Sequence, residues 1–474
     1  MRPSKATFAS DRRPVPLLDL PTPLLTLDLD ALGHNVDTMA AWCRAAGVDL
    51  APHGKTTMSP DVWRLQLDAG AWGITVATAF QASVAREAGV PNVVLAGTTF
   101  HEEALVALAS DPGSSRVLMW VDSVDAVRLA DEALARAAAR GARTDEASDD
   151  SEASDDPAAS DRPHAPAVPP LAVLVEIGSP VGRTGARTLA EALAVVDAVV
   201  AAPHLVLAGV TGYEGALTHD VDGAGIHLID DYLRAVLELL DAIDPAAFAP
   251  WLADGGDVVV SAGGSVYFER VVAVLAERHD PAGARGPRTR VVLRSGSYVA
   301  HDHDLYRRLT PFARDTTPAI DGVTGEETFE PAIELWATVI SRPEPELALL
   351  NVGRRDTADD EGLPLPLDAW RPTGDRDARP RGDDGTTAGG GAPDPSATRL
   401  DGVLDGAVVT ALNDQHAFLR LGASSVLAVG DLVRLGVSHP CTTLSQWREL
   451  SLVRGGSAGR EQPPAVEGTW LTRF

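Results

Sequence analysis

Short apolar runs rich in β-branched residues alternate with amphipathic stretches from Val48 to Arg294. After a strand-like run at 24–27, eight runs predict strands at residues 48–51, 73–76, 92–96, 116–121, 172–177, 205–211, 257–262 and 289–294. Helical periodicity lies between them, for example at residues 31–46, 79–89, 101–109, 124–139, 189–201, 231–240 and 266–276. Apolar strands that alternate with helices indicate parallel β–α–β units. An open doubly wound sheet is one solution, but the count of eight favours a closed (β/α)8 TIM-type barrel.

From Leu335 onward the helical period fades, and the pattern indicates a separate β domain. Its predicted strands lie at residues 335–340, 407–412, 417–421 and 431–435. Two stretches, 143–170 and 371–397, are rich in Asp, Ser, Pro, Gly or Arg and poor in large apolar side chains. Burial there cannot offset the entropy of ordering, so we interpret both as disordered insertions. We therefore expect a barrel domain at residues 21–310 and a β domain at 320–460.

Composition narrows the class of protein. Hydrophobic residues make up 45% of the 474 positions, enough for a large core, and the formal charge of −27 would repel a nucleic-acid backbone. Neither a signal peptide nor an apolar run of membrane-spanning length is present in the sequence, so we expect a soluble cytoplasmic protein. Cys43 and Cys441 are the only cysteines, which suits a reducing compartment and excludes a disulfide framework.

Lys55 stands where the first predicted strand gives way to a helix, in the segment Ala51–Pro60. Ser59 can cap that helix and Pro60 suits its first turn, which fixes the lysine in a short strand-to-helix loop. A barrel enzyme could hold a Schiff-base lysine at this position. His53, two residues earlier, could relay a proton, although packing is the commoner role for such a ring.

Two glycine loops follow the last two predicted strands, Ser261–Ser265 and Arg294–Tyr298. The loops after strands 7 and 8 are where barrel enzymes often bind a phosphate. Backbone N–H groups at Gly263 and Gly264, with a helix beginning near Val266, could hold a dianion. A phosphate on one side of the barrel mouth and an amine on the other match the layout of pyridoxal 5′-phosphate.

Several segments resemble the fold-type III pyridoxal-phosphate enzymes of the D-threonine aldolase and D-serine dehydratase family, distant relatives of alanine racemase. They are Thr22–Leu32, the lysine motif Pro52–Thr56, Glu176–Gly178 with Arg183–Gly185, Gly212–Gly215, Gly296–Tyr298 with Asp302, Asn413–His416 and His439–Cys441. The resemblance implies that Lys55 anchors the cofactor and that relatives pair as homodimers. The expected cofactor-binding residues are Lys55, Arg183, Tyr213, Gly263, Gly264, Ser265, Ser297 and Tyr298. Thr57 stands where the family usually has histidine, and Ala417 replaces a family glycine, so the exact substrate stays open.

His439 and Cys441 are the candidate metal ligands. Residues i and i+2 of a strand point to one face, so an imidazole nitrogen and a thiolate could converge on one zinc ion. With two protein ligands the site would stay open to water and substrate, as in catalytic zinc centres. His301 and His303 form a rival pair that lacks a thiolate.

These features predict a zinc-assisted pyridoxal-phosphate lyase that acts on a small β-hydroxy D-amino acid, with D-serine dehydratase first. In that reaction Lys55 would take the α-proton and the metal would polarise the β-hydroxyl. D-threonine aldolase is the alternative within the fold, but its relatives more often carry His-x-Asp at the metal pair. A pyridoxal-phosphate-binding protein with little catalysis is the alternative from another class. No nucleic acid or membrane partner is expected.

Overall fold

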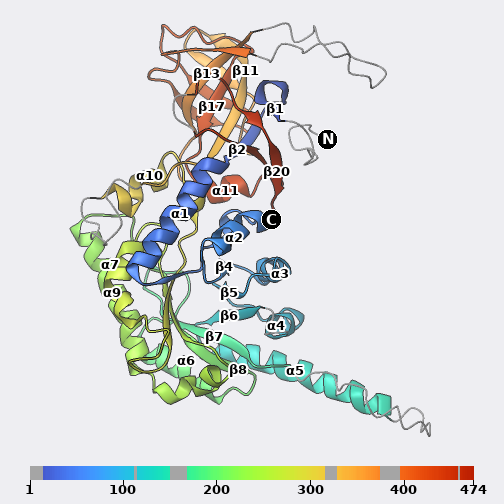
Figure 1. Cartoon of the computed structure of the whole chain (residues 1–474), viewed down its shortest axis with the longest axis vertical. Helices are drawn as coiled ribbons and strands as arrows, with labels where there is room; N and C mark the ends of the chain where they lie inside the picture. The colour runs from blue at the N-terminus through green and yellow to red at the C-terminus, as the bar shows by residue number, and fades with distance from the viewer. Residues whose placement is uncertain (1–13, 111–114, 150–167, 315–327, 374–395, 457–459) are drawn as a thin grey trace.

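The computed structural model describes residues 14–110, 115–149, 168–314, 328–373, 396–456 and 460–474. They form an elongated molecule with an α/β barrel at one end and a β domain at the other (Figure 1). Among the described residues no helix is both long and apolar enough to cross a bilayer.

Eight parallel strands build the barrel in the order β3-β10-β9-β8-β7-β6-β5-β4. They are β3 (Asp49–Leu50), β4 (Ile74–Val76), β5 (Asn92–Leu95), β6 (Arg116–Val121), β7 (Leu171–Glu176), β8 (Leu205–Thr211), β9 (Val258–Ala262) and β10 (Thr289–Leu293). A parallel bridge between His53 and Thr75 joins the two ends of this sheet, with Trp72 N donating to Leu50 O at 2.7 Å. All eight predicted strands are confirmed.

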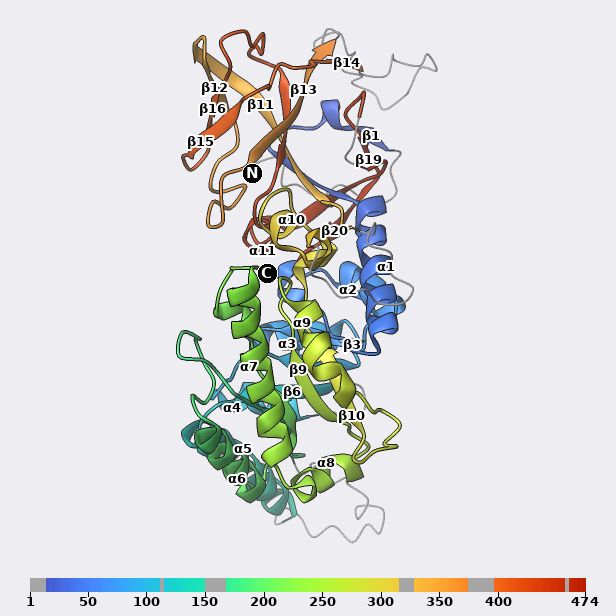
Figure 2. The same ribbon diagram turned by 90° about the vertical axis from the view of Figure 1, so that its left-hand side faces the viewer.

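Helices cover the outside of the barrel, and Figure 2 shows α7 and α9 side by side on one flank. The longer ones are α1 (Leu29–Ala46), α2 (Pro60–Asp68), α3 (Ala79–Glu87), α4 (Glu102–Ala109), α5 (Val124–Asp149), α6 (Leu189–Ala201), α7 (Gly223–Ala242) and α9 (Phe268–Leu275). The short ones are α8 (Ala249–Ala253), α10 (Leu305–Leu309) and α11 (Pro440–Leu444). A separate apolar cluster that includes Val94, Leu118, Leu174 and Val292 comes from the barrel strands themselves, so the barrel is packed and offers no pore.

The β domain contains the four predicted strands and several more. Its main path runs β14 (Ser396–Arg399), β13 (Leu365–Thr373), β17 (Leu432–Gly436), β11 (Ile333–Glu344), β12 (Leu347–Leu350), β16 (Ala417–Arg420) and β15 (Val408–Leu412). The N-terminal strand β2 (Leu24–Asp28) pairs with β11 and with β18 (Glu449–Val453), and β20 (Gly468–Leu471) pairs with β18. A short pair, β1 (Val15–Pro16) and β19 (Ala465–Val466), completes the described strands. The first described strands, β1 and β2, therefore belong to the β domain, and the chain passes from β2 into the barrel through α1.

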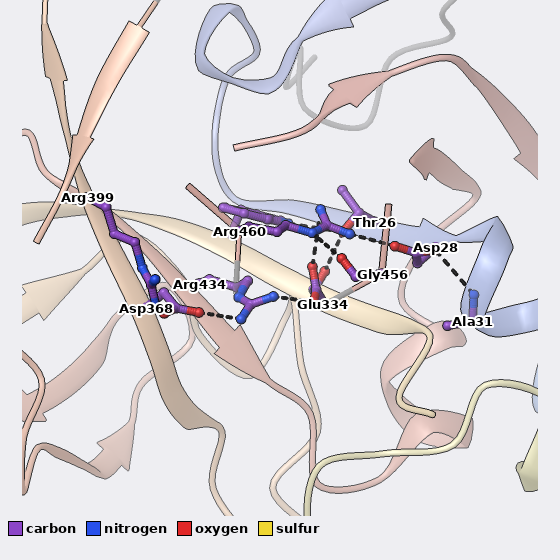
Figure 3. Close-up of polar contacts among 10 residues, drawn as sticks. Thr26, Asp28, Ala31, Glu334, Asp368, Arg399, Arg434, Gly456 and Arg460 are labelled. Atoms are coloured by element: carbon purple, nitrogen blue, oxygen red, sulfur yellow. Dashed lines mark hydrogen bonds and ion pairs between the residues drawn. The ribbon is translucent and has the colours of Figure 1, made fainter. Parts of the chain in front are cut away.

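Buried charged side chains bind one another at the junction of β2 and α1 (Figure 3). Asp28 ends β2 and caps α1, because its Oδ1 accepts the amides of Asp30 and Ala31 at 2.9 and 3.3 Å. Its Oδ2 accepts a hydrogen bond from Arg460 at 2.5 Å. From Arg460 the polar contacts continue through Glu334, Arg434, Asp368 and Arg399. With Asp28 on β2, they join five strands of the sheet: β2, β11, β17, β13 and β14.

Some boundaries differ from the expectation. Helix α5 continues to Asp149, past the predicted start of the first insertion, and residues 150–167 of that insertion lie outside the described residues. The ends of the second insertion join β13 and β14, which pair with each other, and residues 374–395 lie outside the described residues. Helix α9 begins at Phe268 rather than near Val266. The proposed domain limits stay a prediction.

Candidate active site

Lys55 lies in a short 3-10 turn, Gly54–Thr56, between β3 and α2. The turn is tightly packed: a Cβ atom on Gly54 would lie 2.6 Å from Ile74 Cγ2 and 2.7 Å from Trp63 Nε1. Pro60 opens α2 as predicted, but the Ser59 side chain at the cap position accepts no hydrogen bond from a backbone N–H, which corrects the expected cap. Packing against β4 and α2 thus holds the turn that carries Lys55, whose side chain is half-buried.

The lysine content of the chain is itself informative. Only Lys5 and Lys55 are lysines among 40 Lys and Arg residues, and Lys5 lies outside the described residues. Arginine is always protonated and cannot act as an amine nucleophile, whereas lysine can. Nearly all basic residues of the chain are arginines, but Lys55, where the barrel contacts the β domain, is a lysine.

Helix α11 of the β domain packs directly on the Lys55 turn. Cys441 Sγ lies 3.3 Å from the hydroxyl of Thr56 and 3.6 Å from the hydroxyl of Ser297. The lysine turn, the second glycine loop and the candidate metal pair therefore meet at one place, although they are far apart in the sequence.

His439 and Cys441 do not lie on a strand, which corrects the predicted geometry. His439 precedes α11 as its cap residue and Cys441 lies in the first turn, so the helix start brings the two side chains together. His439 Nδ1 is 2.8 Å from Asp360 Oδ2, and Thr442 donates to the same oxygen at 3.0 Å. Burial lowers the pKa of His439, but a hydrogen bond with Cys441 and the charges of Cys441 and Asp360 outweigh it and raise the pKa to about 9.

The thiol of Cys441 is activated by the same contacts. Burial alone raises the pKa of Cys441, but the hydrogen bond and charge of His439 outweigh it, and the pKa falls below its usual value. Thiolate and imidazole are preferred zinc ligands, so the donor set fits that metal. The described part of the chain contains no group of three or more His, Cys, Asp or Glu side chains arranged for a metal. Two protein ligands are therefore what the described residues offer.

On the barrel side of the candidate site, cationic and aromatic side chains lie near Lys55. The guanidinium of Arg183 lies 5.6 Å from the ring centre of Tyr213. Burial and the charges of Lys55, Arg294 and Arg183 hold the pKa of His53 well below its usual range, so His53 is neutral. His53 Nδ1 is buried without a hydrogen-bond partner. An unpartnered ring nitrogen beside Lys55 is the kind of atom that a bound group would satisfy.

The backbone N–H groups of the first glycine loop bind a protein side chain in this structure, which differs from the prediction. The amides of Gly263 and Gly264 both donate to the buried carboxylate of Glu214, at 3.0 and 2.5 Å. The expected phosphate donors are therefore already bonded within the protein. Ser265 and Ser297 do lie together, because Ser297 N donates to Ser265 Oγ at 3.2 Å.

Two other predicted features lie apart from this cluster. The hydroxyl of Tyr298 accepts a hydrogen bond from Gln66 at 2.9 Å, and its ring packs on Phe329, so Tyr298 is a core residue. His301 and His303 are buried, and desolvation lowers their pKa values to about 4 and about 3. The His303 ring packs against Gly436, and the His301 ring packs against Phe329.

Sequence reasoning missed three residues near the site: Asp360, Glu214 as a ligand of the glycine turn, and Tyr306. The Tyr306 ring lies 6.4 Å from that of His439, and its hydroxyl contacts Ser297. Asp360 stands in an acidic loop with no local pattern, and the Gly212–Gly215 motif does not show that the Glu214 carboxylate reaches the glycine turn.

Two family models match the chain. Residues 27–250 match the model described as "Alanine racemase, N-terminal domain", and residues 332–453 match "Putative serine dehydratase domain". The chain thus belongs to the fold-type III pyridoxal-phosphate enzymes of the D-threonine aldolase family, which confirms the resemblance drawn from the motifs.

Individual relatives carry different activities. The chain is 27% identical to the 3-hydroxy-D-aspartate aldolase of Paracoccus denitrificans (strain Pd 1222) over 350 residues, 73% of this chain and 76% of that protein. The solved D-threonine aldolase from Filomicrobium marinum matches with a TM-score of 0.66 and 24% identity over 98% of both chains.

A second solved structure, D-threo-3-hydroxyaspartate dehydratase from Delftia sp. HT23, matches with a TM-score of 0.59 and 22% identity over 97% and 99% of the two chains. Structures of a dehydratase of that name include a histidine-to-alanine mutant and, two positions further on, a cysteine-to-alanine mutant in the metal-free form. At these identities the structural likenesses establish the fold, and they confirm the predicted α/β barrel with a C-terminal β domain.

Proposed function

We propose that this protein is a pyridoxal-phosphate- and zinc-dependent lyase acting on β-hydroxy D-amino acids, with dehydration of D-serine as its first candidate reaction. One observation carries the proposal: the turn that holds Lys55 contacts Cys441 through Thr56, at 3.3 Å. An amine that can bind an aldehyde and a pair of soft metal ligands therefore face one site.

The barrel residues would bind and use the cofactor. Lys55 would hold it through its amine and, with a substrate in place, take the α-proton. The cofactor, when bound, withdraws electron density from the substrate α-carbon. Arg183 and Tyr213 would contact its ring side, and the unpartnered Nδ1 of His53 fits a neighbouring polar group.

The β-domain residues would act at the leaving group. Asp360 accepts from His439 Nδ1, which leaves Nε2 and the Cys441 thiolate as the ligating atoms. A zinc ion held by them would polarise the β-hydroxyl, since hydroxide leaves poorly near neutral pH. Cysteine rather than aspartate at the second position favours dehydration, and the metal-free cysteine mutant of a related dehydratase supports this choice.

Retro-aldol cleavage is the second candidate, because two of the relatives above are aldolases. There the β-hydroxyl would lose its proton and the Cα–Cβ bond would break. Their names also add 3-hydroxy-D-aspartate to the substrates worth testing. A binding protein with little catalysis is the third candidate. We keep the homodimer and the cytoplasmic location as proposals.

A product assay separates these functions. Protein supplied with pyridoxal phosphate and zinc is incubated with D-serine, D-threonine and D-threo-3-hydroxyaspartate, with Lys55→Ala as the control. Keto acid and ammonia would support dehydration, whereas glycine and an aldehyde would support the aldolase. No product from any of the three substrates would refute the lyase.

A further inference from the structure

Tyr232 lies on α7, outside the barrel strands, but its hydroxyl reaches the ends of β7 and β8. The hydroxyl accepts the backbone N–H of Tyr213 at 2.8 Å and donates to the carbonyl oxygen of Ile177 at 2.7 Å. Ile177 directly follows β7, and Tyr213 lies just after β8. One side-chain oxygen therefore joins the ends of two strands that pair with each other in the barrel.

Both backbone groups belong to segments of the candidate site. Ile177 lies at the base of the loop that carries Arg183, because it forms an isolated β-bridge with Ala186. The guanidinium of Arg183 in turn lies over the ring of Tyr213. The Tyr232 hydroxyl thus binds the two segments that bring these side chains together.

The surroundings hold this hydroxyl in place. A Cβ atom on Gly212 would collide with it, so the glycine before Tyr213 leaves the room that the contact needs. Elsewhere on α7, Asp230 accepts two hydrogen bonds from Arg270 of α9, at 2.8 and 2.6 Å. Both of these side chains are largely buried, and such a bidentate pair restricts geometry as well as adding free energy. Helix α7, which carries Tyr232, is therefore attached to α9 (Figure 2).

The hydroxyl is also in the right protonation state for two bonds. Burial raises the pKa of Tyr232, so the phenol keeps its proton at neutral pH and can donate and accept at once. Phenylalanine at this position would leave a buried N–H and a buried carbonyl without this partner. That loss costs more than the loss of a hydrogen bond in solvent.

We propose that Tyr232 is a positioning residue for the cofactor, because its hydroxyl sets the distance between the Arg183 loop and Tyr213. It touches neither cofactor nor substrate and acts through the two side chains that would contact the cofactor ring. The inference rests on the proposed function and deepens it, since it gives a barrel helix a part in the geometry of the site.

A double-mutant cycle tests this role. The dissociation constant of pyridoxal phosphate is titrated by protein fluorescence for wild type, Tyr232→Phe, Tyr213→Leu and the double variant. Tyr232→Phe should bind about five- to tenfold more weakly than wild type. In the Tyr213→Leu background the same substitution should change binding by less than about twofold, because the side chain that the hydroxyl positions is gone.

Visible circular dichroism of the bound cofactor gives a second readout, since it depends on how the ring lies in the protein. At saturating cofactor, Tyr232→Phe should alter this spectrum. Tyr267→Phe is the matched control: Tyr267 is also buried, and its hydroxyl bonds to the carbonyls of Thr218 and Asp220, at 3.1 and 3.0 Å, further along the loop after β8. Urea unfolding should show similar losses of stability for both variants, whereas Tyr267→Phe should keep the wild-type affinity and spectrum.

Equal weakening by Tyr232→Phe in both backgrounds, or wild-type affinity and spectrum in Tyr232→Phe, would overturn the proposal. Hydrogen exchange of the Tyr213 amide, followed by mass spectrometry of overlapping peptides, tests the contact in the wild-type protein should Tyr232→Phe not fold. That amide should be protected, and exchange at the rate of an open chain would also overturn the proposal. Wild-type protein that binds no pyridoxal phosphate would refute the proposed function, and with it the role of Tyr232 toward the cofactor, even where the amide is protected.

Discussion

The side chain of Lys55 can be tested for its chemistry with little ambiguity, because the chain has one other lysine. Protein loaded with pyridoxal phosphate, reduced with borohydride and digested should carry the adduct on the Lys55 peptide. Lys55→Arg keeps the charge but not the nucleophilic amine, so the adduct should vanish and turnover should fall at least about a thousandfold. Lys5→Arg is the matched control and should change neither. An adduct that persists in Lys55→Arg would place the anchor elsewhere.

Glu269 is a second residue whose pKa can be tested, through the pH dependence of stability. It pairs with Arg314 at 2.8 Å, both side chains are buried, and its other carboxylate oxygen has no partner. Burial, only partly offset by Arg314, raises the pKa of Glu269 to about 7. Because the folded state then binds the proton more tightly than the unfolded state, stability falls as pH rises from about 4.5 to about 7.

Glu269→Gln should remove that contribution. Melting temperatures of wild type and variant are measured from pH 4.5 to 8. The wild type should lose stability relative to the variant across the window, by up to about 3 kcal/mol, and the difference should be flat above it. A constant difference at all pH values would show that Glu269 keeps an ordinary pKa in the folded protein.

At the scale of elements, the junction of β2 and α1 depends on Asp28. Arg460→Met would leave this buried carboxylate without its cation, and removing one partner of a buried pair costs about 3–5 kcal/mol. Arg454→Ala is the matched control, since Arg454 pairs with the exposed Asp30 on the same helix, where a surface pair contributes under about 1 kcal/mol. Urea unfolding should show a large shift of the midpoint for the first variant and almost none for the second. Equal shifts would contradict the buried network.

Elements were predictable where local pattern decides them. The apolar runs that became β6 and β8 have the observed bounds, and α6 begins and ends as predicted, because each carries its period within one segment. The Ser59 cap failed for a tertiary reason: that hydroxyl is buried and has no partner, while Thr78 and Thr188 do cap their helices. Residue type suggests a cap, but packing decides whether the side chain reaches it.

At the scale of the whole molecule, the sequence indicated both domains but not how they meet. The motif resemblance singled out Lys55 and Cys441, yet nothing local shows that α11 lies on the Lys55 turn. Nor does it show that β2 joins the sheet of the distant domain. Asp360 and His439 likewise meet across 79 positions. Such contacts follow from the packing of complete domains, which no short window of sequence contains.

The two domains would contribute different steps of the proposed reaction, and these steps can be measured separately. Lys55 belongs to the barrel and would move the α-proton, whereas Cys441 belongs to the β domain and would hold the metal at the β-hydroxyl. Cys441→Ala should therefore slow release of keto acid from D-serine by roughly two to four orders of magnitude, since a Lewis acid supplies several kcal/mol at about 1.4 kcal/mol per tenfold. Exchange of the α-proton with deuterated solvent, followed by NMR, should continue.

Zinc content and the two rates together decide the outcome. Thr442→Ala is the matched control, because Thr442 lies beside Cys441 but is exposed, and its hydroxyl lies within hydrogen-bond distance of Asp360 and the His439 ring. It should retain both rates within a few-fold. If exchange and elimination fell equally in Cys441→Ala, the metal would be acting in substrate binding or folding. Full elimination by protein verified to be metal-free would refute a role for His439 and Cys441 in the chemistry, and the barrel alone would then have to expel the hydroxyl group.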